Sequence, residues 1–198
     1  MKAAIKSGLL ALAAVALPAV AHAHTGVGAA GGLAHGFMHP VGGLDHILAM
    51  VAVGTFASIL GGRALWLVPA SFVLMMAAGG ILGIEGVAVP FVEIGIAASV
   101  IVLGLAVALR WNPPTAVAMG VVSLFAVFHG YAHGAEMPMD ASGVQYALGF
   151  MGATALLHVA GIALGLGLAR VGVKSHVATR LGGSAMALAG LGIMTGIL

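Results

Sequence analysis

Residues 64–84 read ALWLVPASFVLMMAAGGILGI, a run without a charged side chain that lies between Arg63 and Glu85. About 20 consecutive apolar residues are enough for a helix to cross the hydrocarbon core of a bilayer. Inside lipid every backbone N–H and C=O must find its partner within the protein, so only helices and closed barrels can span, and runs of this length are typical of helices. The stretch therefore predicts a transmembrane helix.

The rest of the chain has the same character. Its 198 residues are 62% hydrophobic and 6% charged, and the mean hydropathy is +1.19. This composition excludes a soluble domain with one large core and predicts an integral membrane protein. The chain has no cysteine, which excludes disulfides and thiolate metal ligands. The formal charge of +2 includes two N-terminal lysines, so no basic face remains for nucleic acid.

The N-terminal segment has the features of a secretory signal peptide. Lys2 and Lys6 precede an apolar run over residues 8–17, and the small-residue sequence Ala21-His22-Ala23 is typical of a cleavage site. The apolar run is too short for a comfortable transmembrane span. We therefore expect residues 1–23 to be removed, which would place the mature N-terminus outside the cytoplasm.

The cleavage position decides which residue is the new N-terminus. Cleavage after Ala23 would leave His24 first, where its amine and imidazole could chelate a metal together. Residues 19–21 form a second possible site, and an uncleaved anchor is the alternative to both. Residues 24–198 are expected to form a single transmembrane domain, because no connection is long enough to hold a separate soluble domain.

After a glycine-rich stretch over residues 25–38, the hydropathy pattern resolves into six apolar segments. We predict an all-α polytopic membrane protein with six transmembrane helices near residues 41–60, 64–84, 91–109, 114–134, 143–169 and 177–197. With the N-terminus outside, the first, third and fifth helices run inward and the C-terminus is also periplasmic. The basic residues then all lie on the cytoplasmic side, as the positive-inside rule requires: Arg63, Arg110, Arg170, Lys174 and Arg180.

Glycines recur at four-residue intervals within three of these segments. The pairs are Gly79 and Gly83, Gly161 and Gly165, and Gly192 and Gly196. Small residues at this spacing let two helices approach closely. In a chain with 32 glycines, packing within one molecule is favoured over a dimer interface, and the pattern predicts no oligomeric state.

Two short motifs combine histidine with a carboxylate inside or beside these apolar segments. Residues 39–46 read HPVGGLDH, and residues 129–136 read HGYAHGAE. An ionisable group within a bilayer is costly and is usually retained for a function. In the predicted topology both motifs approach the outer face, with Asp45 and His46 about two turns inside the first helix. Glu93 begins the third helix at the same face.

Imidazole with carboxylate is a ligand set for a borderline transition metal such as Ni²⁺, Co²⁺ or Zn²⁺. Mg²⁺ and Ca²⁺ would require mostly oxygen ligands. The alternatives are a proton relay or pH sensor, and structural hydrogen bonds between helices. Metal handling is favoured, because both motifs pair histidine with a carboxylate.

The remaining histidines have less definite roles. His158 lies deep in the fifth segment, where a hydrogen bond to a neighbouring helix and a place on a metal path are equally supported. His176 lies at the cytoplasmic boundary and is expected to be solvated. His35 lies in the glycine-rich outer stretch, where it could gather metal.

The motifs resemble a known family. The sequences GFMHPVGGLDHILAM over 36–50 and FHGYAHGAE over 128–136, after a signal ending in AHAH, resemble the HupE/UreJ family of bacterial nickel/cobalt permeases associated with hydrogenases and ureases. The resemblance covers essentially the whole mature chain. By this resemblance, the residues that matter for nickel passage are His39, Asp45, His46, His129, His133 and Glu136.

The resemblance implies secondary uptake of Ni²⁺ or Co²⁺ across the bacterial inner membrane, with the metal as substrate, no cofactor and no enzymatic reaction. Two other classes would use the same residues differently. An intramembrane metalloenzyme is disfavoured because the sequence has no His-Glu-x-x-His motif and no Ser or Cys nucleophile beside the clusters. A b-type haem protein would use paired histidines but would have no need for Asp45 and Glu136.

Overall fold

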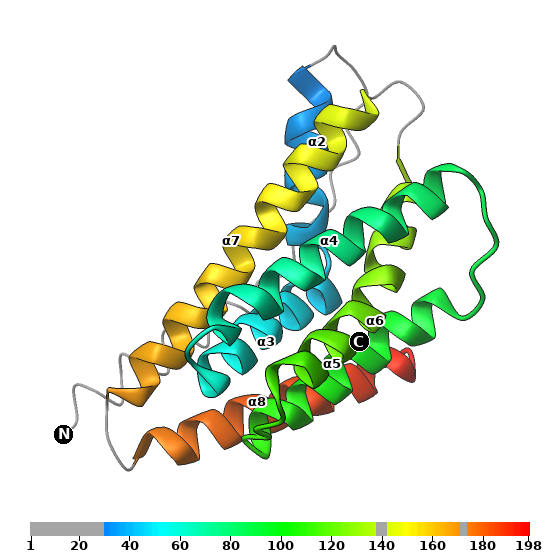
Figure 1. Ribbon diagram of the computed structural model, residues 1–198. Helices are drawn as coiled ribbons and strands as arrows, with labels where there is room; N and C mark the ends of the chain where they lie inside the picture. Colours follow the sequence, from blue (N-terminus) through cyan, green and yellow to red (C-terminus); the bar gives the residue numbers. More distant parts are fainter. Residues whose placement is uncertain (1–29, 138–141, 171–173) are drawn as a thin grey trace.

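The computed structural model describes residues 30–137, 142–170 and 174–198 (Figure 1). The predicted signal peptide, both cleavage sites and His24 lie outside these residues. The described part contains only helices: α2 Ala30–Gly42, α3 Leu44–Leu60, α4 Ala64–Ile84, α5 Val92–Ala108, α6 Thr115–Ala135, α7 Gly143–Ala169 and α8 Lys174–Met194. The all-α prediction is therefore confirmed for this part of the chain.

Each predicted apolar segment coincides with one helix, α3 to α8 in order, and the ends differ by at most three residues. Helices α4, α6, α7 and α8 are long and apolar enough to cross a membrane, and the bent pair α2 and α3 would make a fifth span. Helix α5, with 17 residues, is shorter than a typical span. The protein is thus a multi-pass membrane protein, whereas the count of six spans stays a prediction.

Helix α2 was not expected, because the stretch before residue 39 is rich in glycine. Its glycines serve close packing instead: a Cβ added at Gly36 would collide with the backbone of Tyr146, and one at Gly149 would collide with the backbone of Leu33. Helix α2 thus lies directly along the first turns of α7 (Figure 1). The helix even continues through Pro40.

The chain bends by 83° between α2 and α3. Gly43 is the only residue between the two helices and has an extended backbone conformation. As a result Asp45 is the second residue of α3, rather than two turns inside a continuous helix as the sequence predicted. The bend brings the rings of His39 and His46 against the ring of His133 on α6.

Helices α4 and α6 are in close contact along much of their length. A Cβ added at Gly79 would collide with the backbone of Val127, and one at Gly83 would collide with the backbone of Tyr131. The two contacts follow the same order along both helices, so α4 and α6 run parallel. This pair of glycines packs within the molecule, as predicted.

Helices α3 and α7 pack in the same way. Gly54 lies against the His158 backbone, and Gly165 lies against Ser58, so these helices are also parallel. The third predicted pair behaves differently, because Gly192 faces Leu198 and Gly196 has a positive φ of 71° beyond the end of α8.

The directions of α3 to α8 alternate along the chain (Figure 1). This alternation places the charged residues at opposite ends of the bundle. His46 at the start of α3 lies beside His133 near the end of α6, so these two helices are antiparallel. Phe56 near the end of α3 stacks on Trp111, which follows α5. One end of the bundle therefore carries Arg63, Arg110 and Arg170, and the other end carries Glu85, Glu93 and Glu136.

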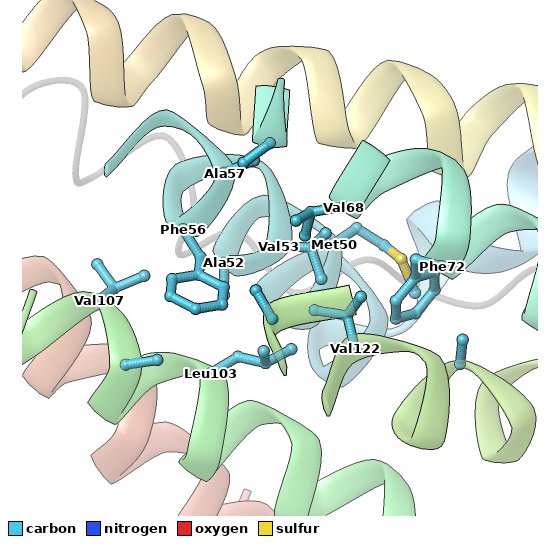
Figure 2. Packing of buried hydrophobic residues seen from close by; sticks show 14 of the residues in the cluster. Met50, Ala52, Val53, Phe56, Ala57, Val68, Phe72, Leu103, Val107 and Val122 are labelled. Atoms are coloured by element: carbon cyan, nitrogen blue, oxygen red, sulfur yellow. The ribbon is translucent and has the colours of Figure 1, made fainter. Parts of the chain in front are cut away.

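An apolar cluster fills the centre of the bundle (Figure 2). Phe56, Val68, Phe72 and Leu103 are fully buried in it. Phe72 lies at one end of the labelled cluster and Val107 at the other (Figure 2). This packing holds α3, α4, α5 and α6 together next to the histidine motifs.

Candidate metal-binding site

A cavity of about 570 Å³ opens at the acidic end of the bundle. Its polar lining comes from α2, α3, α5 and the end of α6: His35, His39, Asp45, His46, Glu93 and Glu136. The two sequence motifs and Glu93 are thus brought to one place, as predicted. Three carboxylates and three imidazoles around one opening would attract a cation.

Asp45 orients the His46 ring. Its carboxylate accepts a hydrogen bond from the His46 backbone N–H at 2.8 Å and lies 2.7 Å from Nδ1 of the His46 ring. A carboxylate can only accept here, so Nδ1 carries the proton and Nε2 keeps its lone pair. Nε2 is buried and has no hydrogen-bond partner. Asp45 therefore leaves this nitrogen free to bind a metal.

Ser99 orients the His129 ring by a similar argument. The Ser99 hydroxyl donates to the backbone oxygen of Ile96 at 2.6 Å, and its oxygen lies 2.9 Å from Nε2 of His129. Because the single hydroxyl proton is already donated, His129 must be the donor through Nε2. Nδ1 then keeps its lone pair, and it too is buried without a partner.

His133 lies at the centre of the imidazole group. Its ring centroid is 4.5 Å from that of His46 and 4.7 Å from that of His39, while the rings of His46 and His129 are 4.8 Å apart. Neither ring nitrogen of His133 has a hydrogen-bond partner. Buried polar atoms in proteins are nearly always satisfied, so such a concentration of unpartnered nitrogens calls for an explanation.

His39 and Glu136 form the outer part of the group. Nε2 of His39 lies 3.1 Å from a Glu136 carboxylate oxygen, and their side chains are 34% and 60% exposed. Glu136 caps the end of α6, and its backbone N–H donates to Ala132 at 3.0 Å. By contrast His129 and His133 are 0% and 2% exposed. The site therefore runs from a solvated mouth to a buried interior.

The arrangement is not a preformed coordination shell. Within the residues that the structure describes, no three His, Asp or Glu side chains are positioned to hold one metal ion together. His158 lies apart from the cavity lining, and His176 is exposed on α8. A metal could be shared by these imidazoles only after their rings turn toward it.

Three contributors had no signal in the sequence. Ser99 lies in an apolar segment and belongs to neither motif, yet its hydroxyl fixes the His129 ring. Tyr146 has a buried hydroxyl without a partner, and its ring lies 6.1 Å from that of His39. A Cβ at Gly43 would lie 2.6 Å from the Asp45 carboxylate, so only glycine leaves room for that side chain. Each role depends on contacts between distant helices or on side-chain space.

Comparison with known proteins assigns the chain to a family. Residues 10–193 match the model of the family described as HupE / UreJ protein. The chain belongs to the HupE/UreJ family. It is 54% identical over 185 residues to protein HupE of Rhizobium leguminosarum bv. viciae, covering 93% of this chain and 95% of that relative. No solved structure matches it.

Membership confirms the resemblance seen in the two motifs and connects this chain with the nickel or cobalt handling associated with hydrogenases and ureases. HupE/UreJ proteins are accessory or transport proteins rather than enzymes. Both motifs lie inside the matched range.

Proposed function

We propose that the protein imports Ni²⁺, or Co²⁺, across the bacterial inner membrane to supply a metalloenzyme such as a hydrogenase or urease. The metal enters through the cavity at the acidic end. The entry site consists of His39, Asp45, His46, His129, His133 and Glu136. Glu93 contributes to the mouth, and His24 adds a ligand if cleavage leaves it at the N-terminus.

The observation that carries this proposal is the group of imidazoles with unpartnered nitrogens. Rings from α2, α3 and α6 meet in one place, and Asp45 and Ser99 hold two of them with a lone pair free. Neutral imidazole binds Ni²⁺, Co²⁺ and Zn²⁺ well, and nearby carboxylates offset the charge of the entering dication. The rings must move to coordinate it, which suits a substrate that has to leave again.

The membrane potential supplies the driving force. The sequence contains no Gly-x4-Gly-Lys-Ser/Thr nucleotide-binding motif. A dication moving inward across 100 mV gains about 4.6 kcal/mol, at about 2.3 kcal/mol per charge. The acidic end of the bundle faces the periplasm in this proposal, so that entry takes place from outside.

Uptake of radioactive nickel by cells tests the function. Cells that produce the protein should accumulate nickel faster than cells with an empty vector, and a tenfold excess of Co²⁺ should compete more strongly than Mg²⁺. Accumulation equal to the vector control, with the protein present in the membrane, would reject the proposal. If unlabelled Ni²⁺, Co²⁺ and Zn²⁺ inhibited the uptake of radioactive nickel equally, the proposed function would be narrowed to general uptake of divalent metals.

A further inference from the structure

His158 is a buried histidine that the entry site does not use. It lies on α7, is 1% exposed, and neither of its ring nitrogens has a hydrogen-bond partner. The sequence left two roles open, an interhelical hydrogen bond or a place on the metal path. Because the ring makes no hydrogen bond, the structure favours the second role.

Thr154 and Met76 supply two further donor atoms at the same contact between α4 and α7 as His158. Thr154 is one turn earlier on the same face of α7, and its hydroxyl donates to the sulfur of Met76 on α4 at 3.6 Å. Thr154 and Met76 are both 0% exposed. An imidazole, a thioether and a hydroxyl thus share one dry layer between α4 and α7.

Phe72 separates this layer from the entry site. Its ring centroid is 5.7 Å from that of His129 and 5.2 Å from that of His158, and it meets the His158 ring nearly edge-on at 87°. Phe72 is one turn before Met76 on α4, so the same helix face carries the barrier and the thioether.

A second cavity lies between α4, α6 and α7. It has a volume of about 210 Å³, and both His133 and Met76 line it, together with Tyr146 and Phe150. His133 therefore borders this inner cavity while its ring lies against His39 and His46, which line the outer one. His133 and the thioether side chain of Met76 thus border the same cavity.

We infer that His158, Met76 and Thr154 form an inner metal site, which receives the ion from His133 through the second cavity while Phe72 separates the two levels. This inference rests on the proposed function for the origin of the ion. The ligand set is neutral and contains sulfur and nitrogen, so it suits a borderline or soft transition metal and not Mg²⁺ or Ca²⁺. Three uncharged ligands bind a dication weakly enough for it to continue inward.

Uptake measurements test the role of this site. Met76→Leu keeps the side-chain volume, and His158→Gln keeps a polar side chain. We expect nickel uptake to fall at least tenfold for His158→Gln and at least threefold for Met76→Leu, with half-saturation changed less than twofold. Met119→Leu, at a partly buried methionine that packs against the core away from this site, should stay within twofold of wild type. Normal uptake by both variants would overturn the inference, and Met76→Leu decides if His158→Gln fails to fold.

A spectroscopic measurement tests the site without relying on transport. X-ray absorption of the purified full chain loaded with Co²⁺ should show a sulfur neighbour of the metal that disappears in Met76→Leu. The signal should remain in Met38→Leu, because Met38 lines the outer cavity instead. Absence of sulfur in the wild type, or its persistence in Met76→Leu, would overturn the inner site. If the wild type imports no metal but the sulfur signal depends on Met76, the proposed function fails and the inner site stands.

Discussion

Two carboxylates in the outer site have different tasks. Asp45 accepts two hydrogen bonds from His46, one from the backbone N–H and one from Nδ1 of the ring. The ring is thereby fixed with Nδ1 protonated and Nε2 free. Glu136 is mostly exposed and meets His39 at the mouth. Asp45 therefore acts on the geometry of a ligand, whereas Glu136 acts mainly through its charge.

Replacing Asp45 by Asn should weaken metal binding by about 10–100-fold, because loss of a carboxylate partner releases the orientation and lowers the basicity of a ligating histidine. The dissociation constant of the purified protein for Ni²⁺, measured by calorimetry, checks this. Glu85→Gln is the matched control, since it removes one carboxylate at the same end of the bundle outside the cavity lining. Equal losses in both variants would indicate a general effect of charge.

Removal of a central imidazole should stop most transport. We expect His46→Ala or His133→Ala to lower nickel uptake more than tenfold while the amount of protein in the membrane stays near normal, because an intramembrane polar group rarely contributes much to packing. His176→Ala, on an exposed residue of α8, should change uptake little. Uptake rates and immunoblots of membranes measure both quantities. A comparable loss in His176→Ala would contradict the entry-site model.

At the residue scale, the sequence predicted which side chains would meet but not how they are held. Motif spacing and alternating topology were enough to place His39, His46 and His133 at one end. The partners Ser99, Tyr146 and Phe72 come from other helices and carry no motif. Their roles depend on ring orientation, which is set by contacts that the sequence does not reveal.

At the element scale, glycine decides how closely helices approach. Gly79, Gly83, Gly54 and Gly165 lie where another helix leaves no room for a Cβ. Long apolar runs predicted the helices themselves, because a helix that crosses lipid needs about 20 uncharged residues. They did not predict α2, since the glycines that discourage an isolated helix allow this one to pack on α7.

An alanine at Gly79 should destabilise the bundle. Its Cβ would meet the Val127 backbone, which cannot rotate away, and overpacking of this kind costs about 1–3 kcal/mol. Gly120→Ala on α6 is the control, because a Cβ there meets nothing within 4 Å. Thermal unfolding of both variants in the same detergent provides the comparison. Equal melting temperatures would show that α4 and α6 are less closely packed than the contact indicates.

At the scale of the whole molecule, charge and direction agree. Arg63, Arg110 and Arg170 follow helices that run one way, while Glu85 and Glu136 follow helices that run the other way. Basic residues prefer the cytoplasmic side of a membrane, so we expect the acidic cavity to face the periplasm.

Reporter fusions test that orientation. Three helices, α6, α7 and α8, lie between Asn112 and Leu198, so the two positions should be on opposite sides of the membrane. Alkaline phosphatase fused after Leu198 should be active in the periplasm, and a fluorescent protein inserted after Asn112 should fluoresce in the cytoplasm. Reversed signals at both positions would reject the proposed orientation, and with it entry of metal through the acidic cavity from outside. Signals from the same side at both positions would instead reject three spans between them, most directly the assignment of α8 as a full crossing.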